Sequence, residues 1–235
     1  MSQEHRSLIA RLRESHSQQR YMFLFGGLLL LLVIAPIFQK SNIYREILAG
    51  ITSIILLTGI YSVLQESRKL FIAGLFLAAL NFATLWREYA VRTITAAMVH
   101  YVGLIIFFLF IIIIILRHIS KETSINRNVI YGAVTVYLLI AFAWGLLFAT
   151  VFLVDRQAFV HVVTEPTASF SPVPFWYLSF MTITTMGYND IAPASDLAKS
   201  LAMIEAVVGQ LYLVLQVSLL VGLRVSEVSR LRERK

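Results

Sequence analysis

Six long apolar runs constrain this chain more than any other feature. They cover residues 21–38, 47–64, 70–86, 95–116, 128–154 and 197–223. Runs of about 18 apolar residues or more can cross the hydrocarbon core of a bilayer as helices. Lipid offers the backbone no hydrogen-bond partners, and nothing in the chain shows the alternating pattern of a membrane barrel. The sequence therefore predicts an all-α integral membrane protein with six transmembrane helices.

The composition agrees with a lipid environment. Hydrophobic residues make up 58% of the chain and charged residues 14%, and there is no cysteine, which excludes disulfides and thiol chemistry. A net charge of +7 would suggest nucleic acid as a partner of a soluble protein. Here the basic residues lie directly beside the apolar runs, as juxtamembrane charges do. We therefore expect membrane lipids as partners and no nucleic acid.

The distribution of Lys and Arg predicts the orientation. If the amino terminus is cytoplasmic, fourteen of the twenty Lys and Arg fall in the segments on the inside. The positive-inside rule then places both termini in the cytoplasm. The first apolar run lacks a small-residue cleavage site, so we interpret it as a retained span rather than a signal peptide. The expected location is a plasma membrane, the inner membrane of a prokaryote, crossed several times.

A shorter apolar segment lies between the last two spans. Residues 155–196 begin with polar side chains but contain the apolar stretch 173–183. Ser171 and Pro172 are favourable residues for starting a helix. A helix over about 172–184 would be only about 18 Å long, roughly half of a bilayer. Such a helix must enter the membrane and return to the side from which it came.

The residues after this half-helix carry a motif. Residues 184–190 read Thr-Thr-Met-Gly-Tyr-Asn-Asp. This segment resembles the pore signature of the potassium-channel superfamily, TTVGYGD, and the resemblance covers an outer helix, a pore helix, a filter and an inner helix over 128–223. The whole chain is similar to a six-span, one-pore bacterial-type ion channel. Because one re-entrant strand cannot surround an ion, the resemblance implies a homotetramer.

The residue order of the motif suits a filter built from backbone. A cation that enters a narrow pore exchanges water oxygens for carbonyl oxygens. Thr185 can add its hydroxyl at the inner end, and Gly187 permits a positive φ. The resemblance implies potassium ions at the backbone carbonyls of Thr185, Met186, Gly187 and Tyr188. The predicted filter consists of Thr184, Thr185, Met186, Gly187, Tyr188, Asn189 and Asp190.

Two positions of the motif depart from the family pattern. Asn189 stands where relatives usually carry a second glycine, and Met186 replaces a valine. Asparagine is the non-glycine residue that best tolerates a left-handed backbone, so Asn189 is compatible with the shape of a filter. The carbonyl of Met186 is available whatever its side chain. The substitution at 189 leaves weak selectivity among monovalent cations, sodium included, as an alternative to strict potassium selectivity.

Several residues near the motif are expected to support the filter. We expect the Tyr177 hydroxyl to hydrogen-bond Asp190, because relatives often anchor the filter aspartate from an aromatic donor at this offset. Trp176 is a second candidate support, and packing of both aromatic residues at the lipid interface is the alternative. Glu205 is a carboxylate at membrane depth, where such groups are costly and usually functional. It is expected behind the filter, or else as a structural hydrogen-bonded carboxyl.

The last span contains the residues expected beneath the filter. Gly209 lies where relatives carry the hinge glycine of the inner helix, and it permits either bending or the close approach of a neighbouring helix. Gln210, Leu213, Val217 and Leu220 share one helical face. The resemblance implies that this face lines a water-filled cavity.

The first four spans show no comparable signature. Residues 99–116 of the fourth span contain no Lys or Arg, so the charge ladder of a voltage sensor is missing. Asn81 and His100 are isolated, and we expect them to be packed residues rather than ligands or proton sensors. The predicted organisation is a cytoplasmic segment at 1–20, a four-helix membrane domain at 21–127, a pore domain at 128–223 and a short basic cytoplasmic tail at 224–235.

These features predict a tetrameric cation channel that conducts potassium passively and is not voltage-gated in the usual way. We expect no cofactor besides the ions in the filter. A non-conducting membrane scaffold with a channel-like fold is one alternative. A secondary transporter is another, although transporters usually interrupt helices in both halves of the chain. The sequence contains no metal cluster, nucleophile pair or phosphate loop of an enzyme.

Overall fold

A computed structural model describes residues 20–64, 67–91, 93–122, 125–162, 171–187 and 190–233. Its six long helices are α2 (Arg20–Phe38), α3 (Tyr44–Val63), α4 (Arg68–Val91), α5 (Ile94–Ile119), α6 (Arg127–Val154) and α8 (Asp196–Glu233). All six are long and apolar enough to cross a membrane. Each begins one to three residues before its predicted start. The prediction of an all-α membrane protein with six spanning helices is confirmed.

Side-chain caps define where two of these helices begin. Thr93 precedes α5, and its hydroxyl accepts a hydrogen bond from the Ala96 N–H at 3.2 Å. Asn126 precedes α6, and its amide oxygen accepts from the Val129 N–H at 2.9 Å. The first N–H groups of a helix lack partners within the helix, so each cap satisfies one of them.

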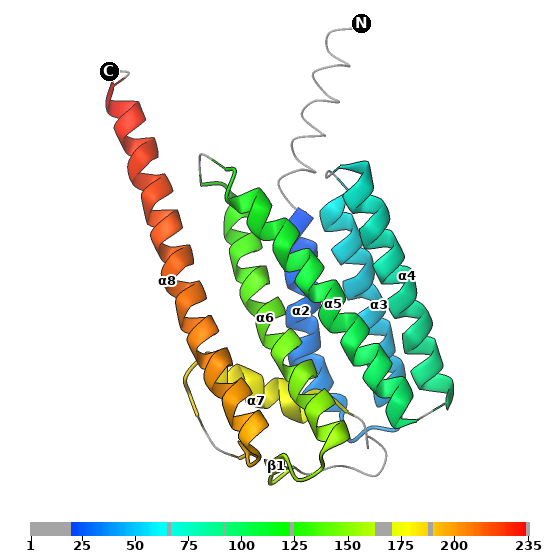
Figure 1. The fold of residues 1–235 in the computed structure, drawn as a ribbon. Coiled ribbons are helices and arrows are strands. Elements are labelled where there is room, and N and C mark those ends of the chain that lie inside the picture. Colours follow the sequence, from blue (N-terminus) through cyan, green and yellow to red (C-terminus); the bar gives the residue numbers. More distant parts are fainter. Residues whose placement is uncertain are drawn as a thin grey trace, which may run out of the picture.

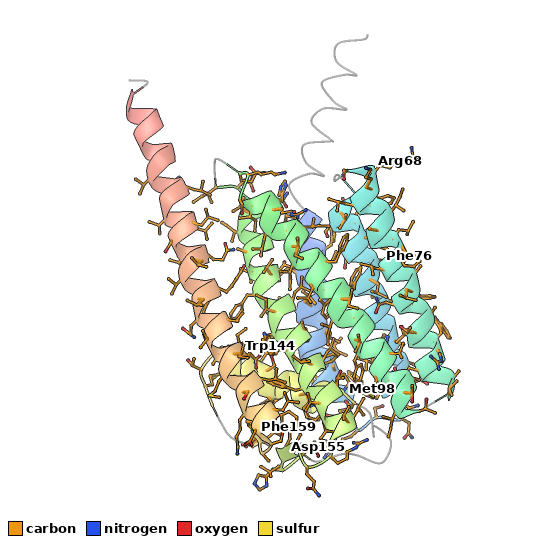
Figure 2. All side chains as sticks on the ribbon, viewed as in Figure 1. Arg68, Phe76, Met98, Trp144, Asp155 and Phe159 are labelled. Carbon is orange, nitrogen blue, oxygen red and sulfur yellow. The ribbon has the colours of Figure 1, made fainter. Side chains whose placement is uncertain are left out.

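The helices run antiparallel to their neighbours in sequence, and α6 packs against both α5 and α2. Figure 1 shows that α2 begins and α8 ends at the same end of the bundle, as an even number of crossings requires. Figure 2 shows Arg68 and Asp155 at opposite ends and Phe76 of α4 pointing away from the bundle. Phe76 is 67% exposed, which suits a helix whose solvent is lipid.

Polar side chains join α4 to α5 within the apolar bundle. Asn81 Nδ2 donates to the carbonyl oxygen of Gly103 at 3.1 Å, and Thr84 Oγ1 lies 3.2 Å from His100 Nδ1. Asn81 is 1% exposed and His100 is 3% exposed. At membrane depth a polar side chain is retained when a neighbouring helix supplies its partner. The prediction that Asn81 and His100 are packed residues is confirmed.

The segment between α6 and α8 contains the short helix α7 (Val173–Ile183). Its 11 residues agree with the predicted half-helix to within one residue at each end. Figure 1 shows α7, in yellow, near one end of the bundle between α6 and α8. A helix of this length spans about 16 Å.

Two strands of two residues each close this segment. β1 (Phe159–Val160) pairs in antiparallel orientation with β2 (Ala192–Pro193). The Ala194 N–H also donates to the Ala158 carbonyl at 2.8 Å. The chain after the predicted filter therefore returns to the end of α6. The strands were not predicted, because two residues are too short to show an alternating pattern.

The carboxy-terminal end is helical beyond the predicted span. α8 continues as one helix from Asp196 through Glu233. Residues 224–233 therefore extend the last membrane helix.

Candidate functional site

The start of α7 has its backbone donors satisfied. The Val173 N–H donates to Ser171 Oγ at 3.3 Å. The N–H groups of Phe175 and Trp176 both donate to the Pro172 carbonyl at 3.0 Å. The remaining residue of this first turn is Pro174, which has no N–H. The sequence Ser-Pro-Val-Pro thus begins a helix without an unpaired donor.

The predicted filter follows the other end of α7. The backbone N–H groups of its first residues donate hydrogen bonds to carbonyls in the last turn of that helix. The Thr185 N–H donates to the Thr182 carbonyl at 3.0 Å. The N–H groups of Met186 and Gly187 both donate to the Met181 carbonyl, at 3.0 and 3.2 Å. Within the described ranges, no hydrogen bond ends on the carbonyl oxygens of residues 185–187. These oxygens keep their capacity to coordinate a cation.

Two of the described residues of the predicted filter have a positive φ. Gly187 has φ 63°, as the motif predicts. Thr185 has φ 60°, which a β-branched residue rarely adopts. Its hydroxyl, predicted at the inner end of the filter, donates to the Thr184 carbonyl at 2.7 Å. Sequence reasoning missed this conformation because threonine has no preference for it, so the surrounding hydrogen bonds must impose it.

The described filter residues Thr184, Thr185, Met186, Gly187 and Asp190 are exposed on the single chain. Met186 has 57% of its surface uncovered. Tyr188 and Asn189 lie outside the described residues. Exposure of a strand with free carbonyls is expected if that strand lines a pore that several chains enclose.

The hydrogen bond predicted between Tyr177 and Asp190 is present. The Tyr177 hydroxyl donates to Asp190 Oδ2 at 2.9 Å. Tyr177 belongs to the first half of α7, whereas Asp190 ends the motif. This bond therefore joins the pore helix to the far end of the predicted filter.

Trp176 lies against α6 rather than at the filter. A Cβ on Gly145 would lie 2.5 Å from Trp176 Cδ1 and 2.8 Å from Trp176 Cα. The rings of Trp176 and Phe142 meet edge to face, with centroids 5.3 Å apart. In the part of the chain that is described, Trp176 Nε1 has no hydrogen-bond partner. This ring anchors α7 on α6, and a role of Trp176 as a support of the filter stays a prediction because Tyr188 and Asn189 are not described.

Glu205 is fully buried and lies behind the pore helix. Ser179 Oγ on α7 donates to Glu205 Oε1 on α8. Ser179 Oγ also lies 2.7 Å from the Ala141 carbonyl oxygen on α6, so the single hydroxyl proton is shared between the two acceptors. Glu205 Oε2 has no partner among the described residues. One serine of the pore helix thus contacts both the outer and the inner helix, on the side where the sequence predicts a support.

Ile183, the residue before the filter, is held from two helices. A Cβ on Gly209 would lie 2.3 Å from Ile183 Cγ1 and 3.4 Å from the Ile183 carbonyl oxygen. Tyr137 Oη on α6 donates to that same carbonyl at 3.2 Å. Of the two interpretations of Gly209, this geometry favours the close approach of a neighbouring helix.

One face of α6 makes the contacts to the pore helix and the inner helix. It consists of Ala133, Tyr137, Ala141 and Gly145, spaced four residues apart. Tyr212 Oη on α8 donates to the Ala133 carbonyl at 2.6 Å, and its ring stacks on Tyr137 with centroids 6.1 Å apart. The spacing was visible in the sequence. However, α6 is apolar on all sides, so its pattern could not identify this face.

Three of the four residues on the predicted cavity face of α8 are exposed, whereas Leu220 is half-buried against the core. Gln210 is exposed, Leu213 is 38% exposed and Val217 is 59% exposed. Glu205 and Gly209, by contrast, are buried in the same helix. The chain's own helices therefore leave Gln210, Leu213 and Val217 of the predicted cavity face uncovered.

Comparison with known proteins identifies the part of the chain that contains α7 and the predicted filter. Residues 134–223 match the model of a family described as "Ion channel". The match runs from the first third of α6 through α7 and the predicted filter into α8, whereas α2 to α5 lie outside it. No curated protein and no solved structure matches the chain.

Proposed function

We propose that residues 134–223, which match a family described as "Ion channel", form the pore domain of a homotetramer that conducts potassium passively. The filter is residues 184–190. The observation that carries this proposal is the backbone of residues 185–187, whose amides bind the end of α7 while their carbonyls stay unbonded within the described chain. A filter needs such oxygens in place of the water around an ion.

The number of subunits follows from the single filter strand and from the surface of α8. Each chain supplies one strand, and four strands around an axis can enclose an ion. Leu211, Val214 and Leu215 on α8 are each more than half exposed. In the tetramer, neighbouring subunits cover part of this apolar surface, and Gln210, Leu213 and Val217 line the cavity.

The proposed ion sites are the carbonyls of Thr185, Met186, Gly187 and Tyr188. The carboxy-terminal ends of four copies of α7 point their partial negative charge toward the cavity and stabilise a cation there. Potassium is the proposed ion, and permeation of sodium is the alternative that Asn189 leaves open.

The four-helix domain does not supply ordinary voltage gating in this proposal. Arg117 is the one Lys or Arg of α5 and stands in the last turn beside His118, where a positive charge interacts favourably with the helix dipole. The position of Lys and Arg along the sequence supports cytoplasmic termini in a prokaryotic plasma membrane. Tags at both termini should be protected from protease in sealed right-side-out vesicles. Cleavage of either tag from the outside would contradict this orientation.

Purified protein in liposomes tests the function. A channel passes potassium down its gradient without a coupled ion, whereas a transporter gives saturable, coupled exchange and a scaffold passes nothing. Cross-linking in the membrane should stop at four copies of the 26.6 kDa chain. Flux that requires a second ion, or no flux from folded protein, contradicts the proposal.

Replacing Asn189 with glycine is expected to raise the ratio of potassium to sodium permeability several-fold. Glycine adopts a left-handed backbone more readily than asparagine and removes an amide beside the outermost ion site. Reversal potentials in mixed potassium and sodium measure this ratio. Met186→Val is the matched control and should leave it unchanged, since only the carbonyl faces the ion. An unchanged ratio in Asn189→Gly would show that position 189 does not set the selectivity.

Loss of the filter supports is expected to weaken potassium binding. Tyr177→Phe removes a hydrogen bond to a carboxylate, which typically contributes about 1.5–3 kcal/mol. Glu205→Ala removes the acceptor that joins Ser179 to the inner helix. The measurement is the rise in melting temperature when potassium replaces sodium, which both variants should reduce. Tyr131→Phe, whose ring packs against Phe25, is the control. If a variant shows the same rise in melting temperature as the native protein, the replaced residue contributes to packing and not to potassium binding.

A further inference from the structure

A hydrogen bond connects the four-helix domain to the start of the pore helix. The hydroxyl oxygens of Tyr44 and Ser171 lie 2.7 Å apart, although the two residues are 127 positions apart in sequence. Tyr44 is the first residue of α3 and is 5% exposed. Ser171 Oγ is also the acceptor for the Val173 N–H. The same hydroxyl therefore caps α7 and contacts α3.

A cavity lies beside this bond. Its volume is about 60 Å³, and its walls come from α3, α4, α5, α6 and the start of α7. Arg45, Glu88 and His100 face it together with Tyr44 and Ser171. The wall is mostly apolar but contains several polar groups, so the space has room for water. Apolar packing holds the start of α7 on α6, whereas on the side of α3 the hydrogen bond is the direct link.

A displacement at the start of α7 is transmitted to the filter, because the helix between them is short. The helix has 11 residues and ends at Ile183, directly before Thr184. Tyr177, which donates to Asp190, stands one helical turn after Val173. A helix is stiff over three turns, so a shift at Ser171 moves Tyr177 and the filter with it.

We propose that Tyr44 is a positioning residue of the pore, through which the four-helix domain sets the placement of the pore helix. The inference rests on the proposed function in taking residues 184–190 as the filter. It gives α2 to α5 a role that the family match, limited to residues 134–223, does not assign. Tyr44 acts through Ser171 and does not touch the ion.

Hydrogen exchange on the full-length protein in detergent tests this proposal. Tyr44→Phe keeps the ring and removes the hydroxyl. We expect the amides of Val173, Phe175 and Trp176 to exchange about fivefold faster, the effect of losing one ordinary hydrogen bond. Amides 184–187 should also exchange faster. Ser171→Ala breaks the same bond from the other side and also removes the acceptor of the Val173 N–H, so the double variant should add little to Ser171→Ala. If one of the two single variants fails to fold, exchange in the other still tests the role of the hydrogen bond.

Tyr61→Phe is the matched control, because Tyr61 lies on the same helix and its ring packs against Phe23. It should leave both sets of amides unchanged. In conducting protein, Tyr44→Phe should also lower the potassium to sodium permeability ratio, as a purely structural role would not. Filter amides that exchange as in Tyr61→Phe, or an unchanged permeability ratio, overturn the proposal. If the native protein passes no ions, the proposed function fails, and the exchange of amides 184–187 still decides whether Tyr44 positions this segment.

Discussion

Replacing Gly145 with alanine is expected to displace the pore helix and destabilise the protein. The added methyl group would lie 2.8 Å from Trp176 Cα and 3.0 Å from the Phe175 carbonyl oxygen, besides 2.5 Å from Trp176 Cδ1. Two of these three atoms belong to the backbone of α7, so no change of rotamer removes the overlap. Overpacking of this kind costs about 1–3 kcal/mol, and more where the backbone must move.

Thermal unfolding in detergent measures this effect. Gly26→Ala is the matched control, because a Cβ at Gly26 has nothing within 4 Å. Alanine is the better helix former, so the control should stabilise its helix by about 0.5–1 kcal/mol. The two substitutions are thus expected to change stability in opposite directions. If Gly145→Ala were as stable as Gly26→Ala, the contact between α6 and α7 described above would be wrong.

Replacing Gly209 with alanine is expected to push the inner helix away from the base of the filter and to reduce conduction. The methyl group would lie 2.3 Å from Ile183 Cγ1. Ile183 is fully buried and its carbonyl accepts from Tyr137, so it has little freedom to move aside. The cost should again be about 1–3 kcal/mol. The displacement occurs one residue before Thr184, where ions would leave the filter for the cavity.

A double variant separates packing at Gly209 from a hinge. Ile183→Ala removes the atom that the new methyl group would meet, so the double variant should be more stable than the sum of the two single changes predicts. A hinge alone gives additive effects, because bending of α8 does not depend on that side chain. Gly222→Ala, on the same helix with nothing within 4 Å, is the control and should conduct normally. Additive losses would therefore favour bending as the role of Gly209.

The sequence by itself determined where the spanning helices and the half-helix lie along the chain, for a clear physical reason. Lipid requires long apolar segments with all backbone groups paired, and α2 to α6 and α8 follow from that rule. Ser171 and the prolines after it indicate the start of α7 by local chemistry. The hydrogen bond between Tyr177 and Asp190 was predictable because it belongs to the recurring pattern of the motif. Gly187 likewise has the positive φ that its residue type allows.

Only the tertiary structure decided which faces of these helices meet. A membrane helix is apolar on all sides, so its pattern does not show that Gly145 faces Trp176 or that Tyr137 reaches Ile183. The positive φ of Thr185 opposes the preference of the residue and follows from the contacts around it. The bond between Tyr44 and Ser171 joins segments 127 residues apart. Local sequence determines where each helix forms, whereas the packing of distant helices determines what holds the filter.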